Sequence, residues 1–120
     1  MKKLLLPIVL WLSIILAGCG TTDTQTKTAA SPIAKFANCI KDSWAKFYGT
    51  TWCSHCKDQK AKFGDSAELL PFVDCDKNGA ICEKAWVKWY PTWSFSNWSK
   101  LEWAQEFVTL ASKTSCQSPL

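Results

Sequence analysis

The chain has 120 residues, of which 48% are hydrophobic and 20% are charged, a composition typical of a folded domain and not of a disordered segment. Its formal net charge is +4, and without Lys2 and Lys3 the remaining 12 lysines and 10 acidic residues give only +2. This charge is too weak to predict nucleic-acid binding. Every basic residue is lysine, so bidentate recognition of phosphate by arginine is excluded as well.

The first nineteen residues have the pattern of an export signal. Two lysines at 2–3 precede an apolar run over 4–16 and a small-residue exit, as in signal peptides. The run has 13 residues, fewer than the roughly 20 that span a bilayer. The exit LAGC at 16–19 resembles the lipobox of bacterial lipoproteins, which implies that Cys19 is diacylated. Two acyl chains hold a protein stably on a membrane.

A tether is expected after the signal. Residues 20–31 are small and polar, without apolar periodicity, and such a segment has an r.m.s. reach of roughly 20 Å. We therefore expect one working domain over 32–120. It would lie at the extracytoplasmic face of a bacterial membrane, in the periplasm or at the cell surface, where disulfides persist.

Helices and strands alternate along this domain. Apolar spacing and turn residues predict a helix over 32–43, a strand over 46–50, helices over 53–63 and 80–87, a strand over 70–75 between them, a hairpin with strands 92–95 and 99–103, and a helix over 104–114. This order predicts a layered α/β domain with a central sheet flanked by helices.

Two cysteines open the second helix, directly after Trp52. A disulfide exchanger needs an exposed thiolate, an adjacent leaving sulfur and a second thiol that resolves the mixed disulfide. Free backbone N–H groups at a helix start stabilise a negative sulfur at Cys53, and Cys56, one turn further, is expected to be more buried and to resolve. We expect His55 to donate to, or pair with, the Cys53 thiolate, which would make the disulfide a stronger oxidant.

Other interpretations of this motif stay open. The two cysteines can form a structural disulfide, or they can bind zinc or copper together with His55, although structural zinc requires four ligands. His55 can also be an ordinary surface residue.

The element order, the C-x-x-C after the first strand and the proline before the third strand resemble the thioredoxin fold. Specifically, the domain looks like the thioredoxin-like domains partnered with or fused to bacterial vitamin K epoxide reductase homologues. The resemblance covers essentially all of 36–116. The matching residues are Phe47-Tyr48-Gly49, Trp52-Cys53, His55-Cys56, Gln59-Lys60, Phe63-Gly64, Val73-Asp74-Cys75, Asn78-Gly79, Cys82 and Tyr90-Pro91-Thr92-Trp93.

The resemblance also implies a substrate-binding edge. Pro91 would be cis and lie against the C-x-x-C, and the backbone of Tyr90 would pair with an extended substrate segment by strand addition. We expect Trp52 to be partly exposed beside the sulfur and Tyr48 to belong to the core.

These observations predict a membrane-tethered thiol–disulfide oxidoreductase with an oxidase poise and no cofactor or metal. It would pass the disulfide of Cys53 and Cys56 to reduced secreted proteins. By resemblance, a quinone-linked membrane protein similar to vitamin K epoxide reductase would reoxidise it. The alternatives are a metal-binding lipoprotein that holds copper or zinc, and a thioredoxin-like reductase of an extracytoplasmic pathway. The reductase would share the site and differ in potential.

The four other cysteines of the domain are expected to form structural disulfides. Cys75 and Cys82 bracket a short turn and can staple it. Cys39 and Cys116 would then join the first and last helices, and closing so long a loop stabilises a domain by about 4 kcal/mol in the chain-entropy model. A relay disulfide of Cys75 and Cys82 is the alternative.

The tryptophan content is unusual, with eight tryptophans against five glycines. Five tryptophans stand where the family pattern has glycine: Trp44, Trp86, Trp89, Trp98 and Trp103. The dipeptide Asn97-Trp98 stands where a two-residue hairpin turn requires Asn-Gly. One hypothesis is that the gene reads UGA as glycine and was translated with UGA as tryptophan. The other is an exposed aromatic binding surface.

Overall fold

The structure is a computed structural model, and it describes residues 30–120. The predicted signal peptide over 1–19, its Cys19 and residues 20–29 of the tether lie outside the described residues. Between residues 30 and 120, no helix is long and apolar enough to cross a bilayer.

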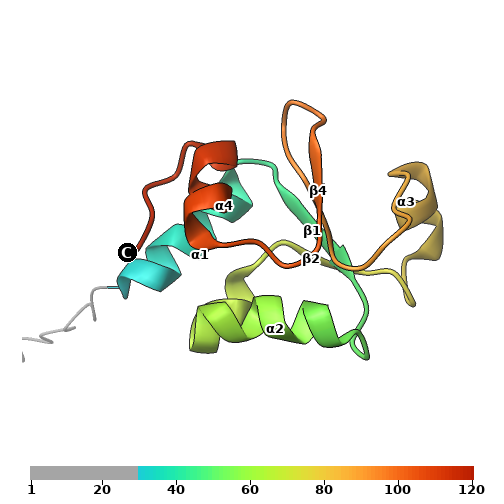
Figure 1. The fold of residues 1–120 in the computed structure, drawn as a ribbon, viewed down its shortest axis with the longest axis horizontal. Helices are drawn as coiled ribbons and strands as arrows, with labels where there is room; N and C mark the ends of the chain where they lie inside the picture. Colours follow the sequence, from blue (N-terminus) through green and yellow to red (C-terminus); the bar gives the residue numbers. More distant parts are fainter. Residues whose placement is uncertain (1–29) are drawn as a thin grey trace, which may run out of the picture.

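The observed elements follow the predicted alternation of helix and strand (Figure 1). They are α1 (Pro32–Asp42), β1 (Lys46–Gly49), α2 (Ser54–Phe63), the 3-10 helix η2 (Gly64–Leu69), β2 (Phe72–Asp74), α3 (Gly79–Lys84), β3 (Thr92–Ser94), β4 (Lys100–Glu102) and α4 (Phe107–Thr114).

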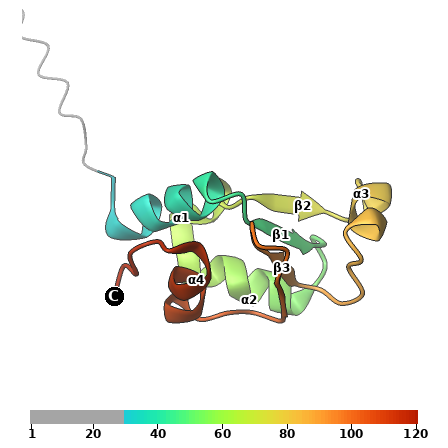
Figure 2. The ribbon, with the colours of Figure 1, turned by 90° about the horizontal axis from the view of Figure 1, so that it is seen from above.

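The four strands form one mixed sheet in the order β2-β1-β3-β4. Strand β1 runs parallel to β2 and antiparallel to β3, and β3 pairs with β4 in the hairpin. Helices flank the sheet, and α3 stands apart from the other three (Figures 1 and 2). This arrangement confirms the predicted α/β class and is thioredoxin-like.

The main core lies between one face of the sheet and helices α1, α2 and α4. Phe47 of β1 and Trp93 of β3 stack with ring centroids 4.7 Å apart, and both are fully buried. Each of the three helices contributes one phenylalanine to a second aromatic group, formed by Phe36, Phe63 and Phe107. The period-3.6 spacing of apolar residues in α1 thus serves to bury one face of that helix.

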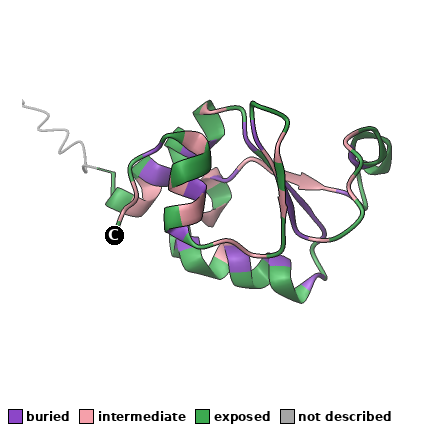
Figure 3. Ribbon diagram, turned by 45° about the horizontal axis from the view of Figure 1, so that its top comes forward, coloured by how far each residue is buried: buried purple, intermediate pink, exposed green. Residues whose placement is uncertain are grey.

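A smaller core lies on the other face of the sheet. Tyr48, as predicted, is buried there, together with Cys75 and Cys82. Helix α3 is exposed except at Cys82 (Figure 3), so its attachment to the sheet depends on this small cluster and on the disulfide within it.

Two disulfides close the domain. Cys39 of α1 is bonded to Cys116, which follows α4, and Cys75 is bonded to Cys82. The first bond joins positions 77 residues apart in the sequence, so it links the beginning of the domain to its end.

Three local features differ from the sequence-based expectations. The 3-10 helix over Gly64–Leu69 was not predicted, and α4 begins at Phe107 instead of residue 104. The hairpin does not turn on two residues with positive φ, because only Trp98 has that conformation. The N–H of Phe95 donates to the carbonyl of Ser99, which leaves a three-residue loop over 96–98.

Candidate active site

Both cysteines of the C-x-x-C lie at the start of α2. Cys53 is the N-cap residue, and its sulfur accepts a hydrogen bond from the backbone N–H of Cys56 at 3.2 Å. N-cap side chains ordinarily accept such bonds through oxygen. Here the sulfur of Cys53 takes that place, so the helix start supplies a donor to this one sulfur.

The two sulfurs have unequal environments. Their Sγ atoms lie 2.6 Å apart, with the thiol of Cys56 donating to the sulfur of Cys53. Cys53 therefore accepts two hydrogen bonds from Cys56. Cys53 is 7% exposed and Cys56 1%. The order of burial is the predicted one, but Cys53 is much less open to solvent than the exposed thiolate expected from the sequence.

Burial raises the pKa of Cys56 from 9.0 to about 12, and its hydrogen bond to Cys53 adds to the rise. A backbone hydrogen bond with Thr50 and the positive charge of Lys60 act in the opposite direction but are weaker. Cys56 therefore keeps its proton at neutral pH whenever the pair is reduced.

This raised pKa predicts how the stability of the reduced protein depends on pH. The folded state holds the Cys56 proton more tightly than the unfolded chain, so this contribution to stability is complete below about pH 9 and is lost as pH rises toward about 12. Urea unfolding of the reduced protein and of Cys56→Ser, compared between pH 8 and 11, measures it. We expect the reduced protein to lose more stability than the variant; parallel losses would contradict the assignment.

Gly49 makes the burial of Cys56 possible. A Cβ atom at this position would lie 2.5 Å from the Sγ of Cys56 and 3.2 Å from the ring of Phe72, closer than packed atoms approach. The missing side chain at the end of β1 is thus the space that the second sulfur occupies. In the sequence, Gly49 stands only among the residues that carry the resemblance, and no local pattern indicates this role.

A buried glutamine fixes α2 against the rest of the domain. Gln59 is fully buried, and its Oε1 accepts hydrogen bonds from Trp93 Nε1 at 3.0 Å and from the Gln105 N–H at 2.6 Å. Its Nε2 donates to the Gln105 carbonyl at 3.1 Å. Because α2 begins with the two cysteines, these bonds also position the candidate site relative to β3. No local pattern in the sequence indicates this role for Gln59 either.

His55 does not make its predicted contact with the Cys53 sulfur. Its Nδ1 lies 3.7 Å from a carboxylate oxygen of Asp58, its ring meets the edge of Trp103 at 5.5 Å between centroids, and its side chain is 57% exposed. A helix displays residues at i and i+3 on one face, so His55 and Asp58 share a face of α2, and no hydrogen bond joins His55 to Cys53 or Cys56. Any effect of His55 on the cysteines is therefore electrostatic and not a hydrogen bond.

Of the substrate-binding residues expected from the resemblance, Trp52 directly precedes Cys53, and Tyr90 packs against the core cluster that contains both cysteines. The peptide bond between Tyr90 and Pro91 is cis, and Pro91 is fully buried. Trp52 is 65% exposed, meets Tyr90 edge-on at 6.3 Å and donates from Nε1 to Asp76 at 2.8 Å. Among residues 30–120, neither backbone group of Tyr90 has a backbone hydrogen-bond partner, so both remain free to pair with another chain.

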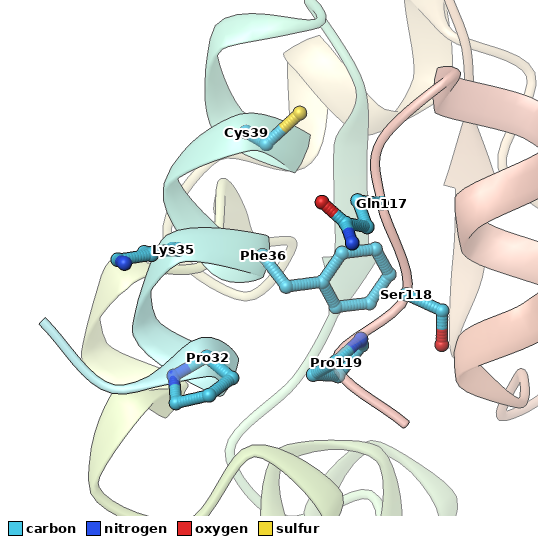
Figure 4. A pocket seen from close by; sticks show the side chains of 7 residues that line it. All are labelled: Pro32, Lys35, Phe36, Cys39, Gln117, Ser118 and Pro119. Atoms are coloured by element: carbon cyan, nitrogen blue, oxygen red, sulfur yellow. The ribbon is translucent and has the colours of Figure 1, made fainter.

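Two further features concern a metal site and a hollow in the surface. No three histidine, cysteine or acidic side chains between positions 30 and 120 come together as metal ligands. A hollow of about 520 Å³ lies between the start of α1 and the C-terminal segment (Figure 4), lined by Pro32, Lys35, Phe36, Cys39, Gln117, Ser118 and Pro119. It contains neither cysteine of the C-x-x-C, so the chemistry is placed at the surface near Cys53 and not in this hollow.

Comparison with known proteins agrees with this chemistry. No protein-family model matches the chain. The chain is 35% identical over 80 residues to the thiol-disulfide oxidoreductase LTO1 of Arabidopsis thaliana. The match covers 58% of this chain and 21% of the Arabidopsis protein, so the chain spans about a fifth of that relative. The relative is named for thiol–disulfide exchange, and in this chain Cys53 and Cys56 lie next to each other at the start of α2.

Proposed function

We propose that this protein is a membrane-tethered extracytoplasmic thiol–disulfide oxidoreductase that oxidises reduced secreted proteins through Cys53 and Cys56. The observation that carries the proposal is the inequality of the two sulfurs. Cys53 accepts hydrogen bonds from both the N–H and the thiol of Cys56, whereas Cys56 is buried and has a raised pKa.

The proposed exchange begins with the oxidised pair. A substrate thiolate attacks the sulfur of Cys53, the bond between the two cysteines breaks, and Cys56 leaves as a thiolate that takes up a proton. A second thiolate of the same substrate then attacks the substrate sulfur that is bonded to Cys53. A disulfide forms within the substrate, and Cys53 leaves as a thiolate. The substrate loses two electrons and gains a disulfide, and the cysteine pair gains those two electrons.

The buried state of Cys56 favours this direction. A mixed disulfide has two fates, because Cys56 can attack it and release the substrate unchanged, or the second substrate thiol can complete the oxidation. Only a thiolate attacks, and desolvation, the largest cause of the raised pKa of Cys56, persists in the mixed disulfide. Attack by Cys56, which would release the substrate unchanged, is therefore slowed. The second substrate thiol then has longer to attack the mixed disulfide and complete the oxidation.

Tyr90 supplies the proposed docking position for the substrate chain. Its backbone groups have no backbone partners within residues 30–120, and its ring lies against Trp52, the residue next to Cys53. An extended substrate segment that pairs with this backbone would be guided to the sulfur by main-chain hydrogen bonds. Such pairing recognises shape and extension more than sequence, as a catalyst with many clients requires.

The tether and the membrane partner are part of the same proposal. The signal pattern over 1–19 and Cys19 support a lipid anchor, and a tether of roughly 20 Å keeps the domain close to the bilayer. A quinone-linked membrane oxidase similar to vitamin K epoxide reductase would take two electrons from the reduced Cys53 and Cys56 and restore their disulfide.

The reduction potential of the pair tests the proposed direction. We expect a value nearer to the roughly −180 mV of protein disulfide isomerase than to the roughly −270 mV of thioredoxin. Equilibration in glutathione buffers, followed by alkylation and mass measurement, gives the potential, and a variant with serine at both Cys53 and Cys56 identifies the signal of this pair. A value near −270 mV would point to the reductase alternative. Stoichiometric copper or zinc retention without thiol exchange would point to the metal-binding alternative.

A further inference from the structure

We infer that the native protein carries glycine at positions 44, 86, 98 and 103, in place of the tryptophans in this sequence. The four backbones all have left-handed φ angles, which are 66° at Trp44, 56° at Trp86, 66° at Trp98 and 73° at Trp103. In this conformation the Cβ of an L-residue lies too close to the following carbonyl oxygen, and only glycine avoids the conflict. The inference does not depend on the proposed redox function.

Positive φ and tryptophan occur at the same positions more often than chance explains. In the part of the chain that the structure describes, five residues other than glycine have positive φ, and all but Ser115 are tryptophan. The other tryptophans there, Trp52, Trp89 and Trp93, do not have positive φ. Position 89, where the family pattern also has glycine, is therefore left out of the inference. Bulky side chains are genuine outliers in this region.

Position 86 has the hydrogen bonds of a helix end that ordinarily uses glycine. Helix α3 ends at Lys84 with Ala85 as its C-cap. The N–H of Trp86 donates to the carbonyl of Glu83 at 2.9 Å, and the N–H of Val87 donates to that of Cys82 at 3.0 Å. These two bonds define a Schellman motif, in which the residue at position 86 is left-handed and usually glycine.

Position 98 is the glycine position of a three-residue hairpin loop. The N–H of Trp98 donates to the carbonyl of Phe95 at 2.9 Å, and the N–H of Phe95 donates to the carbonyl of Ser99 at 3.0 Å. A turn of this kind is followed by one left-handed residue that forms a G1 bulge, where glycine is usual. Trp98 occupies that place with its side chain 90% exposed.

Positions 44 and 103 also lie directly after the end of a helix or a strand. Trp44 comes directly after Ser43, the C-cap of α1, which is the left-handed position after a helix. Trp103 comes directly after β4, and its N–H donates to the carbonyl of Pro91 at 2.8 Å. At position 103 the backbone makes this hydrogen bond, and the indole plays no part in it.

Three of the four indoles gain little in return for the strained backbone, and among the described residues only Trp103 contacts other rings, those of His55 and Trp89. Trp44 and Trp86 are both 77% exposed and Trp103 is 50% exposed. Within residues 30–120, no aromatic pair includes Trp44, Trp86 or Trp98, which argues against one continuous aromatic binding surface.

Trp52 and Trp93 show how this fold uses a tryptophan side chain. Trp93 is fully buried, stacks on Phe47 and donates to Gln59. Trp52 donates to Asp76. A gene that uses UGA for glycine and UGG for tryptophan would produce this division when UGA is read as tryptophan.

The coding sequence and the native protein test the assignment directly. We expect UGA codons at 44, 86, 98 and 103 and UGG codons at 52 and 93. Peptides of the protein isolated from its own cells should have masses that correspond to glycine at the four positions. UGG codons there, or peptides with tryptophan, would overturn the inference.

The stability of variants with glycine at these positions tests independently whether the tryptophan backbones are strained. Each of Trp44→Gly, Trp86→Gly, Trp98→Gly and Trp103→Gly should lower the unfolding equilibrium constant by about threefold, since relief of the left-handed strain exceeds the extra chain entropy of glycine. In the quadruple variant the unfolding equilibrium constant should fall by roughly a hundredfold, because the free-energy changes at distant sites add. Urea unfolding without reductant, followed by circular dichroism, avoids the change in tryptophan fluorescence.

Two matched controls make this result specific. Trp89→Gly alters a tryptophan that is 56% exposed but has no positive φ, so it should bring no gain in stability. Trp93→Gly removes a buried side chain and should raise the unfolding constant strongly. A loss of stability at the four positions, or an equal gain at 89, would overturn the inference, whatever the redox activity of the protein.

Discussion

Cys56→Ser should turn this protein from a turnover catalyst into a trap for disulfide-containing partners, which its reduced Cys53 attacks in the reverse of the proposed reaction. Cys53 is the sulfur with the greater exposure and with two hydrogen-bond donors, so it should form the mixed disulfide. Without the second sulfur no internal attack can release the bound partner. Catalysed thiol–disulfide exchange should fall by at least about a hundredfold, while covalent adducts accumulate. Non-reducing electrophoresis of the reduced variant incubated with a disulfide-containing peptide measures both effects.

Cys53→Ser is the matched counterpart of this variant. It leaves the thiol of Cys56, which is 1% exposed and whose pKa is raised to about 12, so it should form almost no adduct at neutral pH. If adducts formed equally well through either cysteine, the proposed division of roles would be wrong.

Gly49→Ala should impair the site without touching either cysteine chemically. The new methyl carbon would lie 2.5 Å from the Sγ of Cys56, so the sulfur or the start of α2 must move. Overpacking of this kind costs about 1–3 kcal/mol of stability, and displacement of one sulfur from the other should reduce the exchange rate by about tenfold or more. Urea unfolding and an insulin-reduction assay measure the two effects separately.

The chain offers a close control at a second glycine. A Cβ at Gly79 would meet nothing within 4 Å, so Gly79→Ala should change stability by no more than about 0.5 kcal/mol and leave exchange unaltered. Should Gly49→Ala behave like Gly79→Ala, the packing of Cys56 against β1 would not constrain the site.

The order of the elements could be predicted because it depends on local patterns. Apolar residues at helical spacing mark α1, and Gly64 stands at the end of α2 with φ of 52°, as expected of a helix stop. The C-x-x-C was likewise placed at a helix start from the helical pattern that follows it and ends at Gly64. Each of these signals lies within a few residues of the feature that it predicts.

The features that could not be predicted depend on distant partners. The segment before α4 was expected to be helical, but both backbone groups of Gln105 are bound by the side chain of Gln59, 46 residues earlier. No local pattern reports such a contact. The predicted strands 92–95 and 99–103 leave the observed loop over 96–98, but Asn97 suggested a turn with two positive-φ residues, whereas only Trp98 has that conformation.

The candidate site shows the same division. The unequal burial of Cys53 and Cys56 follows from one helical turn and was predicted in its order. The role of Gly49 depends on β1 passing directly beside α2, and the position of His55 depends on Asp58 and on the residue at 103. The contacts of Gly49 and of the residue at 103 are tertiary, so residue types and spacing could not reveal them. His55 and Asp58 lie one helical turn apart, so their pairing is a local feature.

The disulfide between Cys39 and Cys116 also decides what a single cut of the backbone would do. Nearly the whole domain lies within the loop that this bond closes, since the two cysteines are 77 residues apart. A protease that nicks an exposed turn such as 96–98 would open the loop but release no fragment, because both pieces stay joined through sulfur. The C-x-x-C and the residues that position it would then remain in one covalent unit until that bond itself is reduced.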